Sequence, residues 1–256
     1  MAVLRRVGRV AFSVVAWTLS FAWMAFVLAL IAPPTLLGVP WRTLHPLGAG
    51  LFRHVMLLTG NRVRVWRDPR LDVRQPAVYC QNHVNLLDAF VAMTAVPSPF
   101  CGVMNAWQFW VPVYGWAMTM SRGIAVDRSL PREEKVAALS REASRRRDEG
   151  LSILVFPEAH RTRDGRIGGF RLGVFEMARS AGLPVVPVAV RGSRAINRKG
   201  TLGLSCGHVV EVRVGAPRET AGLDDAHLAE LAETLRTEIA SFAERQGASG
   251  PPAAAP

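Results

Sequence analysis

Apolar residues are concentrated at the start of the chain. Residues 11–32 are nearly all apolar and uncharged, and two prolines follow at positions 33–34. At 1.5 Å per residue, a helix over this run would be about 33 Å long, which is enough to cross the hydrocarbon core of a bilayer. Arg5, Arg6 and Arg9 precede the run, as in a signal-anchor. We therefore expect an uncleaved membrane helix that ends at the two prolines.

A second apolar stretch follows the prolines. Residues 41–59 combine leucine, valine, methionine and phenylalanine with Arg42, His45, Arg53 and His54. This spacing is typical of an amphipathic helix lying in a membrane interface. Positive charge lies on both sides of the first helix. The usual excess of arginine and lysine on the cytoplasmic side therefore does not predict which end of this helix is cytoplasmic. The alternatives are one membrane span, a two-helix hairpin dipping into one leaflet, or a buried core helix.

From residue 60 onward, short apolar runs alternate with longer amphipathic ones. Alternation of this kind predicts an α/β domain, here with a mixed, mostly parallel sheet flanked by helices and preceded by a two-helix membrane anchor. We expect the anchor over residues 1–59, the α/β domain over 60–246 and a disordered tail over 247–256. The expected strands are 62–66, 77–80, 100–104, 123–126, 151–156, 185–190 and 209–214, and the expected helices are 130–149, 172–181 and 224–245.

Composition narrows the classes of function. The chain has 256 residues, half of them hydrophobic, and a net charge of +11 carried by 29 arginines and two lysines, Lys135 and Lys199. A disordered chain or a disulfide-stapled mini-protein is excluded, and the positive charge favours an anionic partner. Nucleic acid is not expected, because no zinc-finger, helix-turn-helix or aromatic RNA-binding strand pattern is present. Cys80, Cys101 and Cys206 lie far apart, which favours a reducing compartment and predicts no metal site.

One histidine has neighbours that suggest chemistry. His83 follows an expected strand directly, and Asp88 comes five residues later. On one regular helix the two would lie about 140° apart, so they can meet only if His83 precedes a helix and Asp88 lies in its first turns. In that arrangement the aspartate would fix the imidazole tautomer and the other ring nitrogen could accept a proton from a hydroxyl. A purely structural pair remains the alternative on residue chemistry alone.

A second group of polar residues follows the expected strand 151–156. The segment 156–161 reads Phe-Pro-Glu-Ala-His-Arg, and glycines and further arginines follow it up to residue 171. Charged loops at the carboxyl edge of a sheet are where α/β proteins usually bind ligands, and arginines there favour an anion. A solvated loop is the alternative. Arg128 lies just after the expected strand 123–126, and its position alone does not indicate a function.

Taken in order, these segments resemble the lysophosphatidic acid acyltransferase family of glycerolipid acyltransferases. The resemblance covers about residues 60–215 and rests on four ordered motifs. These motifs are Asn82-His83 to Asp88 (NHxxxxD), Gly123 to Arg128, Phe156 to Arg161, and Val186-Pro187-Val188-Ala189.

The resemblance implies direct acyl transfer without a covalent acyl-enzyme. His83, oriented by Asp88, would be the general base for the acceptor's free hydroxyl, which attacks an acyl thioester. Arg128 and Arg161 would bind the acceptor's phosphate, and Pro187 would shape the acyl-donor side. The other substrate-binding residues that the resemblance implies are Asn82, Gly123, Pro157 and Glu158.

The resemblance also implies the reaction's other components. Acyl-CoA or acyl carrier protein would be the co-substrate, with no cofactor and no metal. The expected partners are membrane lipids and the thioester carrier, with no nucleic acid, and the oligomeric state is open. We expect the inner or plasma membrane, with the catalytic domain on the cytoplasmic face where acyl thioesters are made.

Three departures from the family pattern bear on the acceptor. Asn85 stands where serine is frequent, Ala159-His160 replaces Gly-Thr, and residues 105–107 lack a usual lysine. If that lysine helps to hold phosphate in the family, its absence means that the acceptor could be another lysolipid, such as a lyso-ornithine lipid or lysophosphatidylglycerol, or a glycolipid. A membrane-anchored binding protein without activity is the remaining alternative.

Overall fold

The computed structural model describes residues 2–245, with side chains from residue 6 onward, so the tail expected over 247–256 lies outside the described residues. The strands are β1 (Arg62–Arg67), β2 (Val78–Gln81), β3 (Phe100–Asn105), β4 (Ile124–Val126), β5 (Ser152–Val155), β6 (Val185–Arg191) and β7 (Val209–Val214). The helices are α1 (Ala2–Leu36), α2 (Trp41–Phe52), α3 (His54–Leu58), α4 (Asp88–Ala95), α5 (Tyr114–Met120), α6 (Arg132–Asp148), α7 (Leu172–Ser180) and α8 (Asp225–Ala243), with 3-10 turns η1 (Ala106–Trp110) and η2 (Ser193–Ala195).

The strands form one sheet in the order β1-β7-β6-β2-β5-β3-β4. Neighbouring strands are parallel except β6 and β7, which are antiparallel. Strands β1 and β7 therefore run against the other five. The expected α/β class with a mixed, mostly parallel sheet is confirmed.

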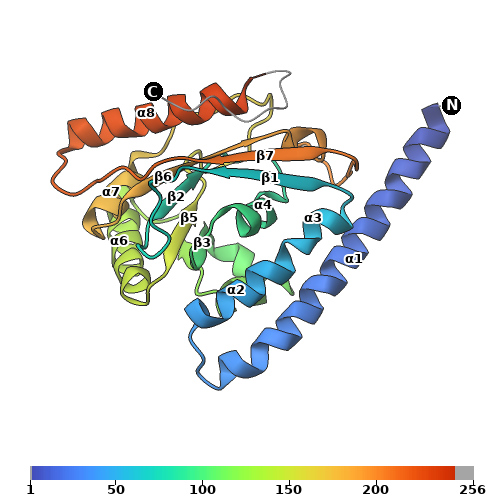
Figure 1. Ribbon diagram of the computed structural model, residues 1–256, viewed down its shortest axis with the longest axis horizontal. Coiled ribbons are helices and arrows are strands. Elements are labelled where there is room, and N and C mark those ends of the chain that lie inside the picture. Colours follow the sequence, from blue (N-terminus) through green and yellow to red (C-terminus); the bar gives the residue numbers. More distant parts are fainter. Residues whose placement is uncertain (1, 246–256) are drawn as a thin grey trace.

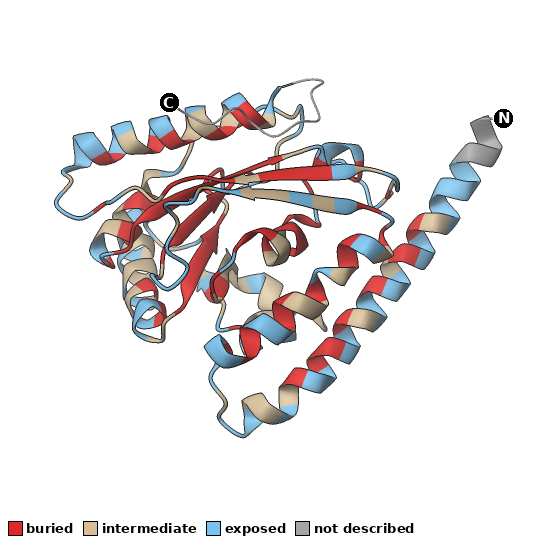
Figure 2. Ribbon diagram, in the orientation of Figure 1, coloured by how far each residue is buried: buried red, intermediate tan, exposed pale blue. Residues whose placement is uncertain are grey.

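Helices cover both faces of the sheet, so the molecule has three layers (Figure 1). Successive side chains of a strand point to opposite faces. Tyr79 and Leu154 accordingly pack with α1, α2, α3 and α4 on one face, while Cys80 and Ile153 pack with α6, α7 and α8 on the other. The central strands are red along their length in Figure 2 because both of their faces are covered.

The first helix is longer than the sequence predicted. The prediction that the two prolines end it is wrong, because α1 includes Pro33 and Pro34 and continues to Leu36. Proline's fixed backbone angle is compatible with a helix, and near the last turn few hydrogen bonds are lost. In the same turn, the Thr35 hydroxyl donates to the Ile31 carbonyl (2.9 Å).

Helix α1 is apolar on more than one side. The most apolar 18-residue window of Arg6–Leu36 has a mean hydropathy of 2.2, and the length and composition of this segment would allow it to cross a membrane. Met24 and Val27 are buried against the rest of the protein, whereas Val10 and Phe26 are more than half exposed. One apolar face therefore packs on the domain while another remains open, which suggests membrane association. The domain division at residue 59 stays a prediction.

Candidate active site

Four of the parallel strands end at the same edge of the sheet, and the segments that follow them lie together there. His83 follows β2, Arg128 follows β4, residues 156–161 follow β5, and Ser193 follows β6. This edge is where open α/β sheets bind their ligands. The topology thus brings the predicted polar segments to one place.

His83 and Asp88 are in contact, in the arrangement that their spacing requires. His83 lies in the loop after β2, and α4 begins at Asp88. The Oδ2 atom of Asp88 lies 2.8 Å from His83 Nδ1 and accepts the backbone N–H groups of Val84 (2.6 Å) and Asn85 (2.9 Å). The Asp88 side chain is 1% exposed and that of His83 24%. With Nδ1 facing the carboxylate, Nε2 is the nitrogen available to accept a proton.

The loop after β5 holds His83 from its other side. The imidazole stacks on Phe156, with ring centroids 4.1 Å apart. The backbone N–H of His83 donates to Glu158 Oε1 (2.8 Å), and the Thr162 N–H donates to the His83 carbonyl (2.9 Å). The ring is therefore fixed by two segments that are about 75 residues apart in the chain. The stacking of Phe156 was not foreseen from the sequence.

Glu158 joins three segments through its carboxylate. Besides the His83 N–H, it accepts the Gly168 N–H at Oε2 (2.9 Å), and the residue is 2% exposed. Burial raises the pKa of this carboxyl above its usual range, although the two backbone N–H groups act in the opposite direction. Glu158 thus holds the His83 loop and the segment around Gly168 in place. Its contact with the acceptor stays a prediction.

Two asparagines connect the His83 loop to β6. The side chain of Asn82 donates to the Val190 carbonyl (3.0 Å) and accepts the Val190 N–H (2.7 Å). Asn85 donates to the Ser193 carbonyl (2.7 Å). These bonds use both polar atoms of the Asn82 amide on backbone, so the structure places Asn82 in the support of the loop. The substrate contact expected of it stays a prediction.

Of the other predicted site residues, Pro157 lies at this edge and Pro187 lies within the sheet, whereas Gly123 precedes β4 and therefore lies at the opposite edge from His83. The carbonyl of buried Pro157 accepts the Arg171 N–H (2.9 Å). A Cβ at Gly123 would lie 2.9 Å from the Met118 carbonyl oxygen, so only glycine fits there without a shift. Pro187 is buried inside β6, beside β2. Their expected roles toward the substrates stay predictions.

The two arginines predicted to bind phosphate both belong to this edge. Arg128 is exposed, and its Nη2 donates to the Ala159 carbonyl (2.8 Å). Arg161 is half-buried, and its Nη1 is a buried nitrogen without a hydrogen-bond partner among the described residues. A second cation, Lys199, donates from Nζ to the Arg161 carbonyl (2.7 Å). Sequence reasoning did not place Lys199 here, although its being one of only two lysines was a signal.

Ala159 adopts the backbone conformation that glycine would have there. Its φ is +62°, in the left-handed region that costs a residue with a Cβ about 1 kcal/mol or more. The next residue, His160, is exposed, and its Nδ1 lies 2.8 Å from the Glu158 carbonyl oxygen. The replacement of Gly-Thr by Ala-His therefore leaves the turn in place under backbone strain.

The two cysteines of the central strands are poor candidates for a nucleophile. Cys80 and Cys101 are buried in the sheet, and burial raises the pKa of each thiol to about 12. Cys80 belongs to the core of β2, in agreement with the expected strand 77–80. Within residues 2–245, no group of three histidine, cysteine, aspartate or glutamate side chains is arranged to hold a metal ion.

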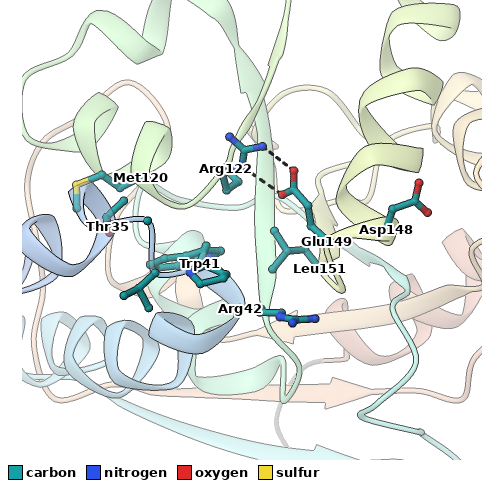
Figure 3. A pocket seen from close by; sticks show the side chains of 11 residues that line it. Thr35, Trp41, Arg42, Met120, Arg122, Asp148, Glu149 and Leu151 are labelled. Atoms are coloured by element: carbon teal, nitrogen blue, oxygen red, sulfur yellow. Dashed lines mark hydrogen bonds and ion pairs between the residues drawn. The ribbon is translucent and has the colours of Figure 1, made fainter.

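A pocket of about 470 Å³ lies at the opposite edge of the sheet (Figure 3). Trp41, Arg42 and Arg122 line it together with Glu149 and Leu151, and Leu151 immediately precedes β5. The Arg122 guanidinium is already bound to Glu149 (2.6 and 3.2 Å). This pocket is therefore separate from the site that contains His83.

Comparisons with known proteins match part of this chain to acyltransferases. A family model described as Acyltransferase matches residues 62–191. A 1-acyl-sn-glycerol-3-phosphate acyltransferase of Limnanthes douglasii is 33% identical over 128 residues, which cover 50% of this chain and 45% of that protein's length. The proteins of the same name from Pseudomonas aeruginosa and Saccharomyces cerevisiae are each 28% identical, over 67% and 78% of this chain and 68% and 66% of their own lengths.

A solved structure shows the same fold. The 1-acyl-sn-glycerophosphate acyltransferase PlsC from Thermotoga maritima superposes with a TM-score of 0.75 and 17% identity, covering 92% of this chain and 97% of that one. The family model spans just over half of the 256 residues and includes His83, Asp88 and Arg161. On this match the chain belongs to the acyltransferase family.

Proposed function

We propose that this chain is a membrane-associated 1-acyl-sn-glycerol-3-phosphate acyltransferase, which forms phosphatidic acid from lysophosphatidic acid. The observation that carries the proposal is the His83–Asp88 contact, on the same sheet edge as Arg128 and Arg161. The names of the relatives from Limnanthes, Pseudomonas and yeast support the same substrate.

In the proposed reaction, His83 Nε2 accepts the proton of the acceptor's sn-2 hydroxyl. The resulting oxygen nucleophile attacks the carbonyl carbon of the acyl thioester, the carbon–sulfur bond breaks, and the thiolate leaves with the proton from His83. A positioned base of this kind contributes about 100-fold to 10,000-fold to the rate. Asp88 stabilises the imidazolium that forms between the two proton transfers, because its Oδ2 faces Nδ1 at 2.8 Å.

Arg128 and Arg161 would bind the acceptor's phosphate. The partnerless Nη1 of Arg161 supports this role, since a buried guanidinium nitrogen is costly to leave without a hydrogen-bond acceptor. Phosphate oxygens are the acceptors that a guanidinium matches best.

The exposed apolar face of α1 supports a location at a membrane surface. Acceptor and product are both lipids, and an enzyme anchored in one leaflet can take its acceptor from that leaflet. We place the domain on the cytoplasmic face of the inner or plasma membrane, where acyl-CoA or acyl carrier protein supplies the acyl group.

A panel of acceptors tests the proposal. The full chain in vesicles is given labelled acyl-CoA or acyl carrier protein together with lysophosphatidic acid, lysophosphatidylglycerol, a lyso-ornithine lipid or a glycolipid. We expect lysophosphatidic acid to give the highest kcat/KM. A higher kcat/KM for another acceptor would contradict the proposed substrate, and no acyl transfer to any of them would contradict the enzymatic proposal.

A further inference from the structure

The two lysines of this arginine-rich chain occupy corresponding positions beside the two arginines of the site. Lys199 Nζ donates to the Arg161 carbonyl (2.7 Å), and Lys135 Nζ donates to the Arg128 carbonyl (3.3 Å). Each ammonium therefore lies against the backbone of an arginine that we assign to phosphate binding. The two lysines differ in how much of their charge is already used.

Lys135 already has a carboxylate nearby. It lies in the first turn of α6, and its charge helps to hold the pKa of Asp127 below the usual range, after the hydrogen bonds from Ser129. Asp127 is exposed and so remains ionised. Its negative charge therefore offsets part of the positive charge of Lys135.

Lys199 is half-buried and has unused hydrogen-bonding capacity. An ammonium has three N–H donors, and only the bond to the Arg161 carbonyl uses one of them among the described residues. Arg161 contributes its own buried and partnerless Nη1 to the same residue's surroundings. Lys199 therefore contacts the backbone of a residue whose own side chain also has a donor without a partner among the described residues. The next residue, Thr162, donates its N–H to the His83 carbonyl.

The loop that carries Lys199 is held in a defined shape. Asn197 donates to the carbonyls of Thr201 and Gly203 (3.0 Å each), and the Ser205 N–H donates to the Ile196 carbonyl (2.9 Å). A charge on a preorganised loop binds an anion without the cost of ordering the chain.

The same loop contacts α1. Trp17 Nε1 donates to the Leu202 carbonyl (2.8 Å), and the Leu204 N–H donates to the Ser13 hydroxyl (2.9 Å). The loop therefore joins the helix that we place at the membrane to the edge of the sheet that contains His83. Lys199 belongs to this loop and contacts the Arg161 carbonyl at the edge of the sheet.

We propose that Lys199 binds the phosphate of the acyl acceptor together with Arg161, and so determines the preference for a phosphate-bearing lysolipid. The inference rests on the proposed function, because it names a further residue for the same acceptor. A phosphate monoester carries up to two negative charges and several acceptor oxygens, which suits one guanidinium and one ammonium. The compact ammonium can serve the Arg161 carbonyl and the phosphate at once.

The test compares Lys199→Gln with Lys135→Gln, which removes the corresponding lysine of the other arginine. For lysophosphatidic acid we expect Lys199→Gln to raise KM about tenfold, equivalent to about 1.4 kcal/mol of binding, with kcat and the KM of the acyl donor within twofold. Lys135→Gln should change each constant by less than twofold. An unchanged acceptor KM in Lys199→Gln, or an equal rise for a monoacylglycerol without phosphate, would overturn the proposal.

A binding measurement separates this inference from the proposed function. Glycerol 3-phosphate should raise the Tm of the wild-type chain and of Lys135→Gln, and raise that of Lys199→Gln by less than half as much. Equal Tm shifts in all three proteins would count against Lys199. Loss of the shift in Lys199→Gln, in a chain that acylates none of the acceptors, would support the anion site and contradict the enzymatic proposal. Lys199→Arg, which keeps the charge, should recover most of the shift.

Discussion

Two histidine–aspartate pairs in this protein have the same separation and very different surroundings. His83 Nδ1 lies 2.8 Å from Asp88 at the carboxyl edge of the sheet, and His227 Nδ1 lies 2.8 Å from Asp224 at the start of α8. The side chains of the second pair are 64% and 65% exposed, whereas those of the first are 24% and 1% exposed. The distance between the two groups therefore does not distinguish a candidate base from a surface contact.

The two carboxylates hold different groups in place. Asp88 is enclosed by the loop that carries His83 and accepts two of its backbone N–H groups, so ring and carboxylate are held together. Asp224 caps α8 by accepting the His227 N–H (2.9 Å). This bond and the His227 ring lower the pKa of Asp224 below its ordinary value. An exposed pair of this kind is screened by water and contributes little.

The largest expected difference between the pairs is catalytic. His83→Ala should lower kcat by about 1000-fold, because it removes the base. His227→Ala should leave kcat within twofold, because its ring faces solvent on the helix layer across the sheet. Steady-state acylation of lysophosphatidic acid measures both, with circular dichroism as the folding control. Near-normal turnover in His83→Ala would contradict the proposed mechanism.

The next effect concerns the carboxylates. Asp88→Asn should lower kcat about 100-fold, since the amide gives less stabilisation to the imidazolium and presents an NH2 group to the enclosing donors. Asp224→Asn should leave kcat and Tm nearly unchanged, because asparagine is an equally good helix cap. Matched kinetics and thermal melts of the two variants test this. Similar kcat values for both variants would show that the buried Asp88 carboxylate does not contribute to catalysis.

The smallest effect concerns backbone strain next to the buried pair. Ala159→Gly should raise the free energy of unfolding by up to about 1 kcal/mol, because φ is +62° there and glycine adopts it freely. Ala229→Gly, at an exposed position inside α8, should lower it by about 1 kcal/mol. Chemical denaturation of both variants measures the change in the free energy of unfolding, which should be positive for Ala159→Gly and negative for Ala229→Gly. A fall for Ala159→Gly would contradict the strain interpretation.

Much of the fold was predictable because it depends on local periodicity. The seven expected strands and the three expected helices of the α/β domain all occur, with bounds that differ by at most two residues. The contact between His83 and Asp88 was also predictable in form, since only a loop-to-helix junction allows a five-residue spacing to close.

Other features depended on contacts that no local pattern contains. Helix α5 has too few residues for a clear hydrophobic period. Strand β7 pairs antiparallel with β6, and the apolar pattern of a strand does not indicate its direction in the sheet. Lys199 comes to Arg161 from 38 residues away, through a loop whose shape depends on contacts with α1. The hydrophobic periodicity of the sequence carries no information about contacts between residues that are so far apart in the chain.

The sequence by itself determined the apolar first helix, the alternation of strands and helices, and the types of residue that carry the proposed chemistry. Tertiary structure alone decided which polar groups are used internally: the carboxylate of Glu158 and the amide of Asn82 bind backbone, whereas Arg161 and Lys199 keep donors free. The physical reason is that a side chain's chemistry is fixed by its covalent structure. Its burial and its partners are fixed by residues that only the folded sheet brings next to it.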